Sequence, residues 1–206
     1  MASLCGRVST LSMDSARKQA KRLPLSQGAL LVAKAAHQGQ LRKGTNLPYI
    51  IHPYSVYGNL RVYTDDQVIL AAAALHDVLE DVDPLLYGEQ DMREDFGDDV
   101  TNTVLLVTKD PTITTWRESN IAYIKTLQTA GDERALLVCA SDKLDNLATS
   151  LHDYARLGES FWNRFAAGKT DQIWWYTSVF NMLHSFLPNH PIVVLYGQKV
   201  ASLNRL

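Results

Sequence analysis

The sequence has little cysteine, no long apolar run and no block of like charge. Its two cysteines, Cys5 and Cys139, are far apart and match no spacing of a metal or redox motif, which indicates free thiols in a reducing compartment. No segment approaches the roughly 20 apolar residues of a membrane span, and the N-terminal stretch lacks the apolar centre of a signal peptide. We therefore expect a soluble cytoplasmic protein, although the Ser, Arg and Lys residues near the start leave an organellar presequence open.

The charge of the chain is nearly balanced, with a formal net charge of −2 at pH 7. Such a balance gives no sign of a protein that coats nucleic acid or lies on a membrane, so any anion must be bound by a local group of cations. The 206 residues, 46% of them hydrophobic, are enough for one substantial core and few for two. We therefore expect a single domain over residues 1–206.

The apolar residues recur at helical spacing, and prolines and glycines fall between the periodic segments. This pattern predicts an all-α fold of about 8–11 helices. The predicted helices span residues 14–22, 26–38, 53–63, 65–81, 84–96, 98–109, 116–130, 132–151, 153–167 and 171–187, with a shorter helix near 191–201. Three local signals support these bounds: Pro84 after Asp83, Gly97 before Asp98, and Glu118 three residues after Thr115.

The first motif of chemical interest lies at 76–81 and consists of His76, Asp77, Glu80 and Asp81. On one helix, these side chains would fall within an arc of roughly 140°. Carboxylates crowded beside an imidazole repel one another and take up protons unless a cation is present, so a divalent metal accounts for the cluster. The alternative is a solvated polar face.

A second histidine, His52, directly precedes Pro53 at an expected helix start, where a proline fits because its missing N–H is not needed. Alone, such a histidine is more often a cap or a packed side chain than a metal ligand. In the segment 135–151, Asp142 lies opposite the apolar stripe of the predicted helix. It therefore faces either solvent or a cleft shared with the 76–81 helix.

Two imidazoles and two carboxylates could meet at one metal ion: His52, His76, Asp77 and Asp142. This mixed set of nitrogen and oxygen donors suits Mn²⁺, Fe²⁺ or Zn²⁺ better than Ca²⁺ or Mg²⁺. Glu80 and Asp81 would remain free to orient or deprotonate a water whose pKa the cation lowers.

The order H…HD…D, with the segments RKG…PYIIHP, LHDVLEDV, FG…V…VTK and ASDKLDNL at these intervals, resembles the HD-domain phosphohydrolases. Within them, it is similar to the hydrolase domain of the RelA/SpoT family and to its stand-alone small alarmone hydrolases. The resemblance covers roughly residues 26–151. It implies an all-helical fold, a single Mn²⁺ ion and removal of the 3′-pyrophosphate from (p)ppGpp or a related nucleotide such as (p)ppApp.

The resemblance also implies roles for individual residues. The metal ligands would be His52, His76, Asp77 and Asp142, and the pair that activates water would be Glu80 and Asp81. The substrate contacts would be Arg42, Lys43 and Asn146, with Lys143 and Thr149 as weaker candidates.

The chain departs from the family pattern at Cys139 and Ala140, where the family usually has lysine and leucine, and this bears on phosphate contacts and base preference. The tail 153–206 is dense in aromatic residues at helical spacing, which predicts core packing. Arg164 or Lys169 in this tail could reach the substrate phosphates, but we assign neither to the substrate. Too few residues follow the motifs for a synthetase domain, so we expect hydrolysis without synthesis.

Two other functions stay open. An HD phosphohydrolase for a 5′-nucleotide, a deoxynucleotide or NADPH would use the same site, and a nucleotide sensor would bind without turnover. Glu80 and Asp81 argue against a sensor, because a module that only binds an anion gains nothing from spare carboxylates. A nucleotide is the expected partner in each case, and the oligomeric state stays open, a homodimer included. We expect His37 to be structural, and His152 and Asp153 to lie at the surface.

Overall fold

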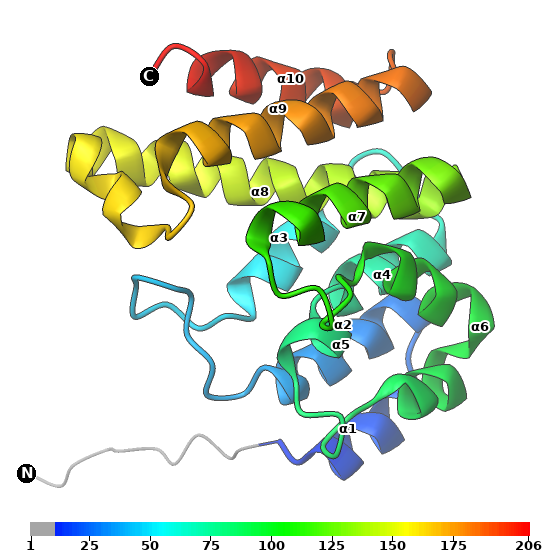
Figure 1. Ribbon diagram of the computed structural model, residues 1–206. Coiled ribbons are helices and arrows are strands. Elements are labelled where there is room, and N and C mark those ends of the chain that lie inside the picture. Colours follow the sequence, from blue (N-terminus) through cyan, green and yellow to red (C-terminus); the bar gives the residue numbers. More distant parts are fainter. Residues whose placement is uncertain (1–10) are drawn as a thin grey trace, which may run out of the picture.

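The computed structural model describes residues 11–206 and is shown in Figure 1. In this range the chain forms ten α-helices and one 3₁₀-helix, with no β-strand, so the predicted all-α fold is confirmed. The elements are α1 (Met13–Ala20), α2 (Leu25–Ala36), α3 (Ile51–Arg61), α4 (Gln67–Leu75), α5 (Val78–Asp81), α6 (Glu89–Val107), α7 (Trp116–Ala130), α8 (Glu133–Leu157), the 3₁₀-helix η1 (Gly158–Arg164), α9 (Gly168–Phe186) and α10 (Pro191–Leu203).

Helix α8 connects two groups of helices. In the view of Figure 1, α1 to α6 fill the lower half, α8 crosses the middle, and α9 and α10 lie above it. Helix α8 contacts α3, α4 and α6 of the lower group, and it also contacts α9, α10 and η1. Its residues therefore belong to the hydrophobic core that both groups share.

Helix α4 is enclosed by other helices. Every residue from Ile69 to Leu75 is buried, because the segment is apolar on all sides and its run of alanines lets neighbouring helices approach closely. Asp66 caps the helix by accepting hydrogen bonds from the backbone N–H groups of Val68 and Ile69. The C-terminal end of α4 therefore lies in the core, and His76 follows it directly.

The predicted helix 65–81 is wrong as a single element, because α4 ends before His76 and α5 starts after Asp77. At the break, Nδ1 of His76 lies 2.8 Å from the carbonyl oxygen of Ala73, which the backbone N–H of Asp77 would use in a continuous helix. The side chain thus competes with the backbone at the end of α4. The four polar side chains at 76–81 therefore do not share the face of one continuous helix that the sequence predicted.

One predicted helix start and one predicted helix cap differ from the structure. The helix predicted over 84–96 starts only at Glu89, because the Asp83 side chain accepts a hydrogen bond from the N–H of Leu85 at 2.9 Å and closes a turn there. Helix α7 begins after Thr115 as predicted, but the Thr115 side chain makes no capping hydrogen bond. The predicted break at Gly97 is confirmed, since this residue has φ 83° and bends α6.

Helix α8 is longer than predicted. It continues through residues 151–153 and ends before Gly158, whose φ of 57° stops it, so the separate helix predicted over 153–167 is wrong. His152 is exposed as predicted. Asp153 is buried, and the prediction that it lies at the surface is wrong, because it pairs with Arg164.

The tail packs largely as predicted. Its buried aromatic residues are Phe161, Trp162, Trp175, Tyr176 and Tyr196. Cys139 is a buried free thiol, and Cys5 lies outside the described residues. Within residues 11–206, no helix has the length and apolar character that a membrane crossing needs.

Candidate functional site

Two histidines from different helices meet inside the molecule. His52 lies in the first turn of α3 and His76 follows α4; both are buried, and their Nε2 atoms lie 3.2 Å apart. Nδ1 of His76 donates to the carbonyl of Ala73 at 2.8 Å, and Nδ1 of His52 donates to the carboxylate of Asp145 at 2.6 Å. Both partners can only accept, so each Nδ1 carries a proton. In the neutral rings, each Nε2 therefore carries the lone pair.

Two carboxylates face the same point. Oδ2 of Asp77 lies 3.0 Å from Nε2 of His76 and 3.4 Å from Nε2 of His52. Oδ1 of Asp142, on α8, lies 3.1 Å from Nε2 of His52 and 3.8 Å from Nε2 of His76. Ligand atoms of His52, His76 and Asp142 lie within 4.8 Å of one another, as a group that could hold a metal ion. The structure thus brings together the residues predicted to bind metal.

The charges of this cluster compensate one another in the protein alone. Burial lowers the pKa of His52, but hydrogen bonds to Asp142 and Asp145 outweigh burial and raise the pKa to about 9. Burial would raise the pKa of Asp77, but His76 and His52 outweigh it and hold that pKa below its ordinary value. A divalent cation would replace the additional proton, on Nε2 of His52, because metals bind the unprotonated nitrogen of an imidazole.

The carboxylates predicted to activate water lie at the edge of this cluster. Oε2 of Glu80 accepts a hydrogen bond from the backbone N–H of Lys109 at 3.2 Å, and the backbone carbonyl of Asp81 accepts one from Gln40 at 3.0 Å. Both side chains reach solvent, yet desolvation by the surrounding protein raises the pKa of each, and the charge of Asp77 adds to this effect. A raised pKa makes a carboxylate a better proton acceptor.

Two lysines lie near the carboxylates of this region, Lys143 at Asp142 and Lys109 at Glu80. Nζ of Lys143 donates to Asp142 and lies 5.5 Å from the ring centroid of Trp175, and Nζ of Lys109 lies 5.3 Å from the same ring. Burial lowers the pKa of Lys109, and the charge of Lys143 lowers it further. Burial also disfavours the charge of Lys143, but the negative charge of Asp142 outweighs burial and raises the pKa above its ordinary value. Sequence reasoning did not assign Lys109, although it ends the VTK segment.

Cys139, where the resemblance to the RelA/SpoT hydrolases led us to expect lysine, lies on the inner side of α8. It is fully buried, and burial raises the pKa of its thiol to about 11, although the charge of Lys143 acts in the opposite direction. The thiol is therefore neutral near pH 7. Cys139 therefore contributes a small packed side chain and no charge.

A cavity of about 280 Å³ lies beside the cluster. Tyr49 and Asn146 line it and connect it to the cluster, because the Tyr49 hydroxyl donates to Asp77 at 2.5 Å and the Asn146 amide donates to Asp142 at 2.5 Å. The rest of the lining is basic, polar and aromatic: Arg42, Lys43, Thr45, Thr149, Ser150, Asp153, Phe161, Arg164, Phe165 and Tyr176.

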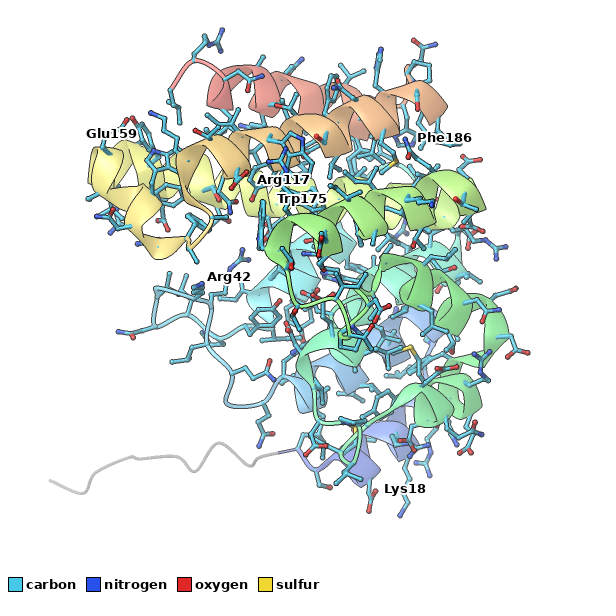
Figure 2. The ribbon with its side chains drawn as sticks, viewed as in Figure 1. Lys18, Arg42, Arg117, Glu159, Trp175 and Phe186 are labelled. Carbon is cyan, nitrogen blue, oxygen red and sulfur yellow. The ribbon has the colours of Figure 1, made fainter. Side chains whose placement is uncertain are left out.

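The predicted substrate residues divide between the cavity and the cluster. Figure 2 shows Arg42 on the segment between α2 and α3, beside the chain that follows α8. Its guanidinium donates to Asp145 at 2.9 Å and to Asn146 at 3.2 Å. Lys43 and Thr149 also line the cavity, together with Arg42 and Asn146, whereas Lys143 lies next to Asp142.

Sequence reasoning missed two residues that hold the cluster in place. Asp145 accepts hydrogen bonds from both His52 and Arg42, and Tyr49 donates to Asp77. Asp145 could have been found, because a residue three positions after Asp142 on one helix lies on the same face. Tyr49 gave no comparable signal, since it precedes α3 and its direction depends on the fold. His37 is buried and contacts Gln40, in agreement with its predicted structural role.

Residues 29–173 match the family described as HD domain. The match covers more than half of the chain, so the chain belongs to the HD domain family. Curated relatives include a guanosine-3′,5′-bis(diphosphate) 3′-pyrophosphohydrolase of Aquifex aeolicus, 41% identical over 124 residues, and the bifunctional (p)ppGpp synthase/hydrolase SpoT of Escherichia coli K12, 36% identical over 136 residues. The alignments cover 60% and 64% of this chain but 17% and 18% of the relatives, so the chain spans less than a fifth of their length.

Two solved structures share the fold. One is a metazoan ortholog of SpoT, described as hydrolysing ppGpp and taking part in starvation responses; it has a TM-score of 0.73 at 25% identity, covering 89% of this chain and 98% of that one. The other is lmo0812 from Listeria monocytogenes EGD-e, with a TM-score of 0.66 at 27% identity, covering 75% and 99%. The resemblance to the RelA/SpoT hydrolase domain is thereby confirmed.

Proposed function

We propose that the protein is a metal-dependent nucleotide pyrophosphohydrolase that removes the 3′-pyrophosphate of (p)ppGpp or of a related alarmone such as (p)ppApp, without synthetase activity. One observation carries the proposal. Ala73 and Asp145 hold the Nδ1–H groups of two buried histidines, so both Nε2 atoms face the carboxylates of Asp77 and Asp142. The activities named for the relatives in Aquifex aeolicus and in a metazoan support it. We extend the proposal to one HD-type domain over residues 1–206, working in the cytoplasm.

We assign the metal ligands to His52, His76, Asp77 and Asp142, and the metal to Mn²⁺. The residues fit such an ion because they present two nitrogens and two carboxylate oxygens, with N–O separations of 3.0–3.8 Å, to one point. When bound, a divalent cation supplies Lewis acidity that polarises a phosphate and lowers the pKa of water.

Hydrolysis breaks the bond between the 3′ oxygen and its phosphorus, and yields pyrophosphate and a nucleotide with a free 3′-hydroxyl. Glu80 and Asp81 orient the attacking water and accept its proton, a role that fits their raised pKa. Lys109 and Lys143 offset the negative charge on the phosphate oxygens.

The cavity holds the nucleoside. Arg42 offers a planar cation for the base and phosphates, and Lys43 offers a point charge beside it. Asn146, between the cavity and Asp142, is placed for the ribose, and Thr149 lies one turn further along α8. Lys143 contacts phosphate at the cluster.

The test is a turnover assay. The purified protein is incubated with ppGpp, ppApp, NADPH and a panel of 5′-nucleotides, with Mn²⁺ or with a chelator, and the products are separated by chromatography. Release of pyrophosphate from a 3′-pyrophosphorylated nucleotide, lost with the chelator, supports the proposal. Release of monophosphate would favour another HD phosphohydrolase, and binding without product would favour a sensor.

Single substitutions separate metal binding from water activation. Asp77→Ala and Asp142→Ala should lose Mn²⁺ and activity together, because each removes a ligand oxygen. Glu80→Gln should retain Mn²⁺ and lose turnover by about a hundredfold or more, because it removes a proton acceptor. A matched control is Glu94→Gln on α6, an exposed change that should affect neither. If Glu80→Gln combined with Asp81→Asn turned over at the wild-type rate, the assignment of this pair would be wrong.

A further inference from the structure

An ion pair that the proposed mechanism does not use lines the cavity. Nη1 of Arg164, the last residue of η1, donates to Oδ2 of Asp153 on α8 at 2.6 Å. Asp153 is buried, and both residues line the cavity. A buried carboxylate needs a partner, so the pair fixes the position of the guanidinium.

Arg164 also contacts the segment that carries the basic pair. A Cβ atom added to Gly44 would lie 3.3 Å from Cζ of Arg164 and 3.4 Å from its Nε, so the guanidinium lies against the backbone there. Gly44 has φ 77°, a conformation that other residues rarely adopt. Arg42 and Lys43 directly precede it. Three cations from two distant segments thus converge on one cavity.

The rest of the Arg164 guanidinium is free to bind an anion. Among the contacts within residues 11–206, its one hydrogen-bond acceptor is Asp153. Arg42, by contrast, already donates to Asp145 and Asn146. The side chain of Arg164 is 28% exposed, so a ligand in the cavity can reach it.

Helix α8 sets the distance between this pair and the metal cluster. Asp142, Asn146, Thr149 and Asp153 follow one another at helical spacing on one face, and the last three line the cavity. The eleven residues from Asp142 to Asp153 correspond to about 16 Å along the axis. If an ion contact of up to about 4 Å is allowed at each end, about 8 Å remains between two bound phosphate groups. A ribose with phosphates on both sides spans a similar length.

We propose that Arg164, positioned by Asp153, binds the 5′-phosphates of the nucleotide whose 3′-pyrophosphate lies at the metal cluster. This deepens the proposed function and rests on it. Arg164 thereby selects nucleotides phosphorylated on both sides of the ribose, because a guanidinium can bind a phosphate through two hydrogen bonds.

A phosphate suits Arg164 better than a base does. An arginine can also pair with the edge of guanine, but the convergence of Arg42, Lys43 and Arg164 favours a multiply charged group. The aromatic rings of Phe165 and Tyr176 line the same cavity and offer faces for the base.

The test compares two substrates that differ only in their 5′-phosphates: ppGpp, and guanosine 3′-diphosphate with a free 5′-hydroxyl. Arg164→Gln should raise KM for ppGpp by about tenfold to a hundredfold with little change in kcat, and leave KM for the second substrate nearly unchanged. Arg164→Lys should recover part of the affinity for ppGpp, because it restores the positive charge but not the planar guanidinium that can form two hydrogen bonds with a phosphate. Equal losses for both substrates would overturn the proposal.

Two further variants guard against a folding defect and a general charge effect. Asp153→Asn combined with Arg164→Gln replaces the ion pair by a neutral hydrogen-bonded pair, and should show the same selective loss for ppGpp. Lys169→Gln is the matched control: Lys169 pairs with Glu159 at 2.9 Å and does not line the cavity, so KM for both substrates should stay at the wild-type value.

Failure of the proposed function gives a different result. In that case the wild-type protein hydrolyses neither substrate, and calorimetric titration with GDP and with guanosine tests Arg164 directly. Binding of GDP weakened about tenfold or more by Arg164→Gln, with guanosine unaffected, would support the phosphate contact. Equal binding of GDP to the variant and the wild type would overturn it.

Discussion

Asp145 should control the affinity of the cluster for metal although it is not one of the four proposed ligands. Its Oδ2 accepts hydrogen bonds from Nδ1 of His52 at 2.6 Å and from Arg42 at 2.9 Å. The first bond holds the imidazole so that Nε2 faces Asp142, and the negative charge makes that nitrogen a stronger donor to a metal. Asp145→Asn keeps an acceptor at this position and removes the charge.

The expected loss follows from the burial of His52. The side chain is 2% exposed, so water cannot replace the lost charge. Outer partners of metal-bound histidines typically change metal affinity by about 10–100-fold, or about 1.4–2.7 kcal/mol. We expect a loss of this size for Asp145→Asn. Asp145→Ala should lose about 1–3 kcal/mol more, because it leaves the buried Nδ1–H without an acceptor.

Titration of the metal-free protein with Mn²⁺, followed by calorimetry or by the paramagnetic resonance of free Mn²⁺, measures this loss. Arg42→Gln is the matched control, because it removes the other partner of Asp145 without changing the acceptor of His52. It should weaken nucleotide binding and leave Mn²⁺ affinity near the wild-type value. If Asp145→Asn bound Mn²⁺ as tightly as the wild type, the role given to the His52–Asp145 bond would be refuted.

Three further outcomes are expected. Gly28→Ala should lower the free energy of unfolding in urea by about 1–3 kcal/mol, because its Cβ would lie 2.8 Å from the backbone oxygen of Ala20. Gly58→Ala, with open space around its Cβ, should raise the free energy of unfolding by about 0.5–1 kcal/mol. Equal effects of the two substitutions would contradict this packing. In the metal-free protein, the pKa of His52 is raised from about 6.5 to about 9, so its stabilising contribution is complete below pH 6.5 and is lost as the pH rises through 9. The free energy of unfolding, measured in urea, should therefore fall by about 3 kcal/mol over this range. A flat pH profile would refute this reasoning. Cys139, with burial raising its pKa to about 11, should resist a thiol reagent at pH 8 in a variant whose other cysteine is replaced by serine, until urea unfolds the protein; rapid labelling of the folded protein would contradict its burial.

The sequence was sufficient for the fold class and for the residue types of the cluster. Helical periodicity is a local property, so it can be read from the sequence without knowing which other helices a segment packs against. The break at Gly97 is local as well, because glycine adopts a positive φ without steric cost. The ends of two helices were predicted wrongly, because they depend on contacts outside the local sequence. At His76 the side chain bonds to the carbonyl of Ala73 and α4 ends, and α8 extends past His152 to Leu157, with Asp153 paired to Arg164 from the following 3₁₀-helix.

What only the tertiary structure decided is which distant residues meet. Asp145 and Tyr49 have ordinary sequence surroundings, and their roles arise because α3, α8 and the segment before α3 converge on one cluster. Arg164 is a further case: it follows α8 in the chain, yet its guanidinium lies against Gly44, more than a hundred residues earlier. The local sequence determines helices and their apolar faces, because these depend on near neighbours. The contacts that tune charge in the site are long-range, so they depend on how the helices pack.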